Sequence, residues 1–148
     1  AGVPLQIVGD SITVTSPERL LPVSVRTHEY PGFPTDAQSP LMVLLTQAVG
    51  ESTVVESIFD GRLNYTNELV RMGANITLVS PHRAKIVGPT PLTARTVESP
   101  DIRAGLALVL AAAIAAGTST IERADIIDRG YEHIEDKLSA LGLKIVRK

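Results

Sequence analysis

The stretch EYPGFPTDAQ, residues 29 to 38, contains a carboxylate in an unusually rigid setting. Two prolines and a glycine restrict the backbone just before Asp36. One interpretation is a helix cap, because an aspartate side chain accepts hydrogen bonds from free amides of a first helical turn and contributes about 1 kcal/mol. The other is catalysis, because Ser39-Pro40 offers a better helix start, with serine as the cap and proline at the first helical position. Both interpretations stay open.

Three arginines form a second group. Arg62 and Arg129 each precede a predicted second helix of their part of the chain, and Arg103 falls in the first turn of another. A cation there faces the positive end of the helix dipole, which is unfavourable by up to about 1 kcal/mol. Nearby carboxylates such as Asp60 and Asp128 can compensate. So can an external anion, because helix-end amides and guanidinium groups together bind phosphate or carboxylate. Three such placements together favour an anionic ligand.

Several classes of site and partner are not supported. The three histidines lie far apart and cysteine is absent, so no metal or cofactor is predicted. Neither a phosphate-binding loop nor a dinucleotide fingerprint is present. A net charge of −2 without a basic block, and 3% aromatic residues, argue against nucleic acid. The longest apolar run, residues 104 to 116, is shorter than the roughly 20 residues that cross a bilayer. We therefore expect a cytoplasmic protein without a membrane partner.

These residues sit in a repeated pattern of elements. Two units match at an offset of 67 positions. The matched pairs are Gly50 with Gly117, Arg62 with Arg129 and Glu68 with Glu135, and a shift of two more residues matches Gly73 with Gly142. In each unit the pattern predicts an apolar helix ended by a glycine, a β-branched strand, a second helix and another strand. These elements are expected at 40–49, 52–57, 64–72 and 75–79, and at 101–116, 118–123, 131–141 and 144–148.

The pattern predicts a layered α/β (α+β) domain of repeated helix-strand units. The first unit adds a returning strand at 84–88, and residues 1–15 look like the hairpin end of an earlier unit. We therefore divide one domain into a terminal hairpin of a truncated unit, 1–22, and two complete units, 23–88 and 89–148. The arrangement suggests a truncated piece of a larger domain.

Five stretches resemble the enolpyruvyl transferases. They are YPGFPTD (30–36), ESIF followed by Arg62, ELVRMGA (68–74), DIRAGLALVLA (101–111) and DRGYEHIEDKLSALG (128–142). They follow the family's order along nearly the whole chain, and they are most similar to the branch that uses UDP-N-acetylglucosamine. A shikimate-type acceptor fits less well. Gly61, Tyr65-Thr66-Asn67 and Ser39-Pro40 depart from the family's pattern and put the role of the Arg62 loop in doubt.

The resemblance implies an inside-out barrel fold in a two-domain enzyme, with three similar units in each domain and the active site between the domains. The family moves the enolpyruvyl group of phosphoenolpyruvate to the 3-hydroxyl of the nucleotide sugar and releases phosphate, a step of peptidoglycan synthesis. The reactive cysteine loop would lie in the missing remainder of the enzyme. We expect the isolated chain to be inactive and prone to self-association, because its missing neighbours expose apolar surface. The alternatives are a non-catalytic anion-binding or assembly module with this fold, and a divergent paralogue with another acceptor.

The resemblance also assigns roles to individual residues. Asp36 would be the base that contacts the sugar hydroxyl, and Ile58 and Phe59 would line the nucleotide-sugar pocket. Arg103 and Arg129 would face the carboxylate and phosphate of phosphoenolpyruvate. Arg62 would bind substrate in a less defined role. An aspartate with a pKa near 3.9 is a weak base, so Asp36 must be tightly oriented or have its pKa raised by partial burial.

Overall fold

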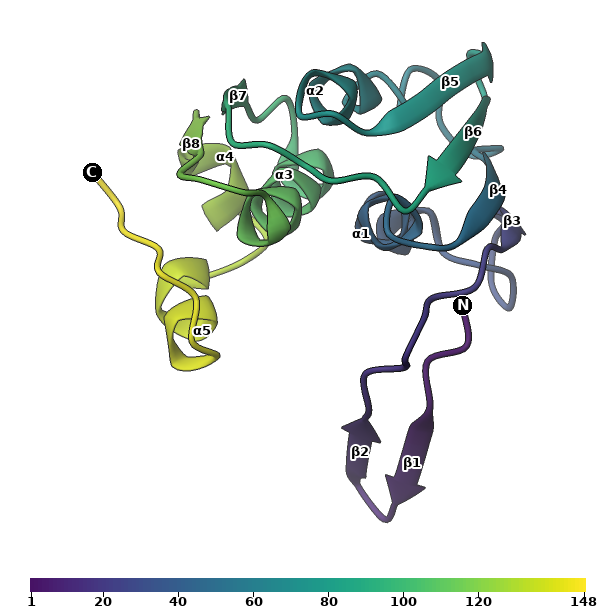
Figure 1. Ribbon diagram of the computed structural model, residues 1–148, viewed down its shortest axis with the longest axis horizontal. Helices are drawn as coiled ribbons and strands as arrows, with labels where there is room; N and C mark the ends of the chain where they lie inside the picture. Colours follow the sequence, from purple (N-terminus) through teal and green to yellow (C-terminus); the bar gives the residue numbers. More distant parts are fainter.

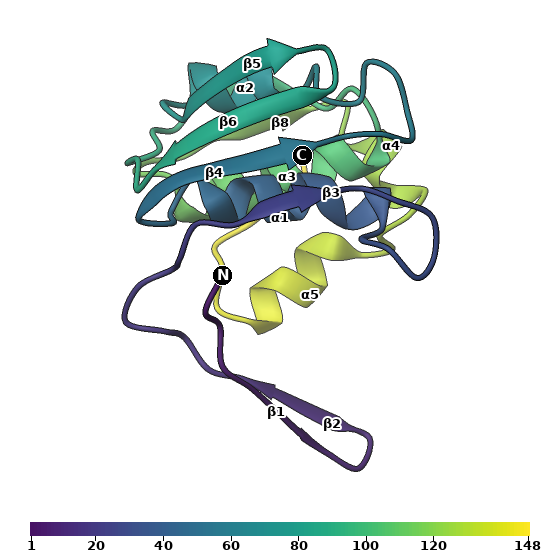
Figure 2. The ribbon, with the colours of Figure 1, turned by 90° about the vertical axis from the view of Figure 1, so that its right-hand side faces the viewer.

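A four-stranded sheet with helices packed on one face forms the centre of the computed structural model, which describes residues 1–148 (Figures 1 and 2). Its strand order is β3-β4-β6-β5. The strands are β3 (Ser24–Arg26), β4 (Gly50–Val55), β5 (Asn75–Ser80) and β6 (Arg83–Gly88). Strand β4 runs parallel to β3 and antiparallel to β6, which pairs antiparallel with β5. The predicted strands at 52–57, 75–79 and 84–88 are thus confirmed, with shifts of one or two residues.

Two smaller sheets flank the centre. The hairpin of β1 (Leu5–Val8) and β2 (Ser11–Val14) confirms the predicted N-terminal hairpin and projects away from the rest of the chain (Figure 2). Strands β7 (Thr96–Glu98) and β8 (Thr120–Glu122) form a parallel pair. None of the helices combines the length and the apolar character that a membrane-spanning helix requires.

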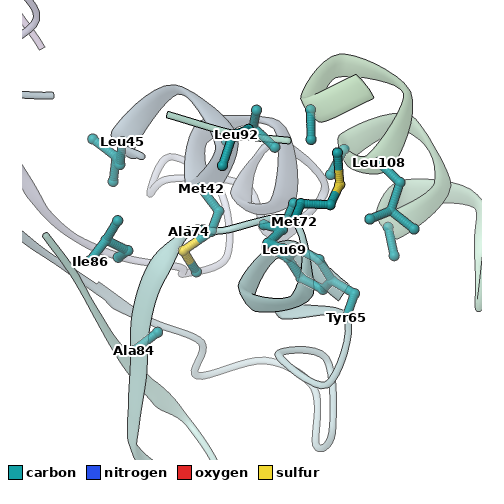
Figure 3. Packing of buried hydrophobic residues seen from close by; sticks show 14 of the residues in the cluster. Met42, Leu45, Tyr65, Leu69, Met72, Ala74, Ala84, Ile86, Leu92 and Leu108 are labelled. Carbon is teal, nitrogen blue, oxygen red and sulfur yellow. The ribbon is translucent and has the colours of Figure 1, made fainter. Parts of the chain in front are cut away.

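The helices are η1 (Thr35–Ala37, a 3₁₀ turn), α1 (Gln38–Leu45), α2 (Thr66–Arg71), α3 (Ile102–Ile114), α4 (Asp125–Asp128) and α5 (Ile134–Ala140). Helices α1 and α3 pack side by side, and α2 covers the β5 end of the sheet (Figures 1 and 2). Aliphatic and methionine side chains fill the space between these helices and the sheet (Figure 3). Met42, Leu69 and Met72 are fully buried there, and Leu108 joins them from α3. This core fixes the N-terminal ends of α1 and α3 relative to each other.

The two units use the same backbone pairing. The amide of Thr27 donates to the carbonyl oxygen of Val55 at 2.9 Å, and the amide of Ser99 donates to that of Glu122 at 3.0 Å. The second helix of each unit also ends alike, with Gly73 and Gly142 at φ angles of 108° and 94°. At both ends the glycine and the next residue close paired hydrogen bonds onto the last helical turn, as in a Schellman motif. The glycine helix ends predicted at these two positions are confirmed. The proposed unit boundaries stay predictions.

Several local predictions are wrong. Helix α1 begins at Gln38 and not at Pro40, because the 3₁₀ turn leads directly into it. Pro40 therefore lies in the first helical turn. Its missing N–H costs no helical hydrogen bond there. The helix ends at Leu45, and Gly50 is the first residue of β4 and not a helix cap. Residues 144–148 form no strand, and the expected long helix at 131–141 is the shorter α5, preceded by the separate turn α4.

Candidate active site

Asp36 lies in the 3₁₀ turn before α1 and does not cap a helix. The residue at the cap position of α1 is Ala37, and neither η1 nor α1 has a side-chain cap. Instead, Oδ1 of Asp36 accepts hydrogen bonds from Nη1 of Arg62 at 3.1 Å and from Nε of Arg103 at 2.9 Å. Oδ2 accepts a longer bond from Nη2 of Arg103, at 3.4 Å. The capping interpretation is therefore wrong, and two guanidinium groups orient the carboxylate.

This setting lowers the pKa of Asp36. The hydrogen bond from Arg103 is the largest cause, and Arg62 acts in the same direction, whereas partial burial opposes both. The side chain is 59% exposed, so burial is too weak to reverse the effect. Asp36 was expected to be tightly oriented or to have its pKa raised by partial burial. The structure provides the tight orientation, and it lowers the pKa instead of raising it.

Arg62 is held between three groups from two loops. Its Nη1 atom donates to Oγ1 of Thr35 at 2.9 Å as well as to Asp36. Its guanidinium carbon lies 4.3 Å from the ring centre of Phe59, a cation–π distance. The Arg62 side chain is only 16% exposed. The nearby Asp60 does not pair with it and contacts His82 instead. These contacts give Arg62 one fixed orientation toward Asp36.

Glu56 is the residue that sequence reasoning missed. It is fully buried directly after β4, and its carboxylate is satisfied by four donors. Oε1 accepts from Oγ1 of Thr27 at 3.0 Å and from the amides of Ile58 and Phe59 at 2.9 and 3.2 Å. Oε2 accepts from Oγ1 of Thr35 at 2.8 Å. Glu56 thus joins the loop that carries Phe59 and Arg62 to the turn that carries Asp36. The only sign of this role in the sequence was the position of Glu56, a carboxylate at the end of a β-branched strand.

Arg103 reaches the site from the second unit. It lies in the first turn of α3, where Asp101 accepts hydrogen bonds from the amides of Arg103 and Ala104 at 2.8 and 2.9 Å. Asp101 is therefore a helix cap, and Arg103 pairs with Asp36 rather than with it. The hydroxyl of Ser39 donates to the Arg103 carbonyl oxygen at 2.9 Å, which ties α1 to α3 beside the site.

Arg129 differs from the other two arginines. It follows α4 directly, and its exposed side chain makes no hydrogen bond or ion pair. The neighbouring carboxylate, Asp128, pairs with Arg147 at 2.7 Å. A methyl group on Gly130 would lie 2.6 Å from Cγ2 of Ile102, so the chain at Arg129 runs beside the first turn of α3. The structure thus brings Asp36, Arg62 and Arg103 together and leaves Arg129 with its guanidinium unpaired.

Two of the four departures in the Arg62 loop, Tyr65 and Thr66, face the interior, whereas Gly61 and Asn67 are exposed. Tyr65 is 3% exposed, and its hydroxyl accepts a hydrogen bond from Nε2 of the buried Gln38 at 3.1 Å. Burial is the main reason that the pKa of Tyr65 is raised. Thr66 is buried as well, and its hydroxyl donates to the Leu63 carbonyl oxygen. No cluster of three or more His, Asp or Glu side chains that could hold a metal ion occurs.

Comparison with known proteins identifies the family of the chain. A family model described as EPSP synthase (3-phosphoshikimate 1-carboxyvinyltransferase) matches residues 5–138. The chain belongs to this family. Members of the EPSP synthase family named UDP-N-acetylglucosamine 1-carboxyvinyltransferase are 51% identical over 146 residues in Koribacter versatilis and 50% identical over 148 residues in Acidobacterium capsulatum. Each match covers 99% of this chain and 34% of the relative, so the chain spans about a third of these relatives.

Solved structures show the same fold. The enolpyruvyl transferase NikO from Streptomyces tendae superposes with a TM-score of 0.92 at 25% identity, over 99% of this chain and 34% of that one. An EPSP synthase from Acinetobacter baumannii superposes with a TM-score of 0.67 at 16% identity, which supports the fold alone. The predicted layered α/β enolpyruvyl transferase fold and the family resemblance are confirmed.

Proposed function

We propose that this chain is part of an enzyme that transfers the enolpyruvyl group of phosphoenolpyruvate to the 3-hydroxyl of UDP-N-acetylglucosamine, with release of phosphate. The observation that carries the proposal is the Asp36 carboxylate held by Arg62 and Arg103 within a chain that is half identical to transferases named for that acceptor. The product would enter peptidoglycan synthesis in the cytoplasm.

The charges of the site suit this reaction. Two guanidinium groups surround one carboxylate, which leaves one positive charge in excess for the carboxylate or phosphate of phosphoenolpyruvate. Arg129 is unpaired and can add a second cation. We assign phosphoenolpyruvate to Arg103 and Arg129, a supporting role to Arg62, and the nucleotide-sugar pocket to Ile58 and Phe59.

Asp36 can act as the base because its partners also bind the other substrate. In the free protein the two arginines favour its ionised form, so it is ready to accept a hydrogen bond from the sugar hydroxyl. An anionic substrate that takes hydrogen bonds from Arg103 weakens that stabilisation. The pKa of Asp36 then rises toward its ordinary value, which makes it a better proton acceptor as the hydroxyl oxygen attacks.

The remaining catalytic groups would lie outside these residues. The chain has no cysteine, so a reactive cysteine loop must come from the remainder of the enzyme. We therefore expect residues 1–148 alone to be inactive and to show some self-association. The same two guanidinium groups could also bind an anion in a non-catalytic module or in a paralogue that uses another acceptor. A turnover assay with two acceptors distinguishes these functions.

The test measures phosphate release from phosphoenolpyruvate by the full-length protein, with UDP-N-acetylglucosamine or shikimate 3-phosphate as acceptor. Turnover is expected only with the nucleotide sugar, and Asp36→Ala is expected to lower it about 10²- to 10⁴-fold. Asp10→Ala, in the exposed turn between β1 and β2, is the matched control and is expected to keep full turnover. Unchanged turnover in Asp36→Ala would reject the assigned base, and no turnover in the native protein would favour the binding module.

A further inference from the structure

Ser39 carries a buried hydroxyl beside the site, in a stretch where the chain departs from the pattern of its family. It lies in the first turn of α1 and is 2% exposed. Its Oγ donates a hydrogen bond at 2.9 Å to the main-chain carbonyl oxygen of Arg103, which is 64 positions further along the chain, in the first turn of α3. No other hydrogen bond joins α1 to α3. Ser39 is therefore the one polar link between these two helices.

One turn of the chain holds Arg103 at both of its ends. Asp36, three residues before Ser39, accepts hydrogen bonds from the guanidinium group, from Nε at 2.9 Å and from Nη2 at 3.4 Å. Ser39 donates to the main chain of the same residue. Residues three apart in a helical turn lie on the same side of it. The turn that runs from η1 into α1 thus presents an acceptor to the side chain of Arg103 and a donor to its backbone.

The second unit does not fix Arg103 relative to α1 by itself. The side chain of Asp101 caps α3, and the hydroxyl of Ser99 donates to the Asp101 carbonyl oxygen at 3.2 Å. Both contacts shape the start of α3 from within the second unit, whereas the Ser39 bond sets its place against the first. A carbonyl oxygen has two lone pairs, so the Arg103 carbonyl accepts from Ser39 without giving up a helical hydrogen bond.

We propose that Ser39 is a positioning residue, which holds the main chain of Arg103 so that its side chain can exchange Asp36 for an anionic substrate without movement of α3. The role in enolpyruvyl transfer rests on the proposed function. The Arg103 side chain is 37% exposed, so an anion can reach it. Its backbone is anchored, so only the guanidinium group has to move. Such anchoring matters because a displacement of about 1 Å can cost about 10²-fold in rate.

The test uses the full-length protein and compares Ser39→Ala with Thr46→Val. Thr46 directly follows α1 at its other end and is fully buried. Its hydroxyl donates at 2.7 Å to the Val43 carbonyl oxygen, which belongs to α1 itself and not to α3. Each variant loses a buried hydroxyl, so both should lower the melting temperature by a similar amount. Only Ser39→Ala should change the site.

Two measurements detect that change. Carboxyl-carbon NMR follows the titration of Asp36, whose pKa is expected to rise toward its ordinary value in Ser39→Ala and to stay as in the native protein in Thr46→Val. Steady-state kinetics with both substrates give the second measurement. In Ser39→Ala the KM for phosphoenolpyruvate is expected to rise about three- to tenfold, which corresponds to one net hydrogen bond. The KM for the nucleotide sugar should not change.

The proposal is overturned if the pKa of Asp36 is the same in the two variants. It is also overturned if both variants of an active enzyme have the same KM for phosphoenolpyruvate. A native protein without turnover would reject the proposed function instead. The titration of Asp36 needs no substrate, so it would then still decide whether Ser39 places Arg103.

Discussion

The two units share a backbone frame but use the residue after the central strand in opposite ways. After β4 comes Glu56, which is fully buried and bonded to four donors. At the equivalent position after β8 comes Arg123, which has a φ angle of 55° and pairs on the surface with Glu98 at 2.9 Å. The comparison teaches that one repeat serves as a rigid support for the site, whereas the other contributes Arg103 to it.

The cores differ in the same direction. The main cluster of 18 buried residues joins the sheet of the first unit to α1, α2 and α3. The second cluster has only three buried residues, Val109, Ile127 and Ile134. Burial of apolar surface is the main stabilising contribution, so the first unit should be the more stable of the two. For the same reason, truncating a buried side chain should destabilise the first unit more than the second.

The largest expected effect compares two leucines at the same place in their helices. Leu69 and Leu138 each provide the carbonyl oxygen that accepts a hydrogen bond from the residue after the glycine at the helix end. Leu69 is fully buried, so Leu69→Ala should lower the free energy of unfolding by about 3 kcal/mol. Leu138 is only partly buried, and Leu138→Ala should cost about 1 kcal/mol or less. Urea denaturation measures both. Equal losses would show that the second cluster is as well packed as the first.

The second prediction separates the two residues that follow the central strands. Glu56→Ala leaves two buried or partly buried threonine hydroxyls and two amides without their acceptor, and should lower the free energy of unfolding by about 3 kcal/mol. Arg123→Ala removes one exposed ion pair and should cost less than about 1 kcal/mol. Glu56→Gln keeps one acceptor oxygen and should fall between them. A Glu56→Ala protein as stable as Arg123→Ala would contradict the supporting role of Glu56.

The smallest expected effect concerns the ion pairs that join the units. The lowered pKa of Asp36 means that its contribution to stability is present above the ordinary value of 3.8 and is lost as pH falls through its pKa in the folded protein. Because the carboxylate is exposed, the contribution should be below about 1 kcal/mol. The difference in unfolding free energy between the native chain and Asp36→Asn should therefore shrink from pH 7 to pH 2.5.

Carboxyl-carbon NMR gives an independent measure of the same pairing. Arg103→Ala should raise the pKa of Asp36 more than Arg62→Ala does, since the Arg103 hydrogen bond is the larger cause of the shift. An unchanged titration in Arg103→Ala would mean that the second unit does not hold Asp36 in solution.

Much of this arrangement could be predicted from sequence because its signals are local. The hairpin at 5–14, the strands around β4 to β6 and the glycines after α2 and α5 each have a short-range pattern, and the repeat revealed their order. Strands β3 and β7 were missed because three residues are too few for a periodic pattern, whereas the equally short β8 was predicted through its match to β4 in the repeat. The strand expected at 144–148 does not form, because no strand lies beside these residues to pair with them.

The site shows the same limit. The sequence indicated Asp36 and the arginines as site residues. It did not indicate that Asp36 pairs with Arg103, because the two residues belong to different units and their spacing in the sequence does not predict a contact. Nearby carboxylates were the obvious partners for Arg62 and Arg103, yet both arginines contact Asp36 instead. Glu56 could not be recognised as buried because its four donors come from segments that meet only in the folded chain.

The ion pair between Asp36 and Arg103 makes the charge of the site depend on how two helices pack. Within the first unit, Asp36 and Arg62 cancel each other's charge. The surplus cation comes from α3, which belongs to the following unit. A shift of α3 away from α1 would therefore leave a neutral pair with little attraction for an anion, although neither helix had unfolded.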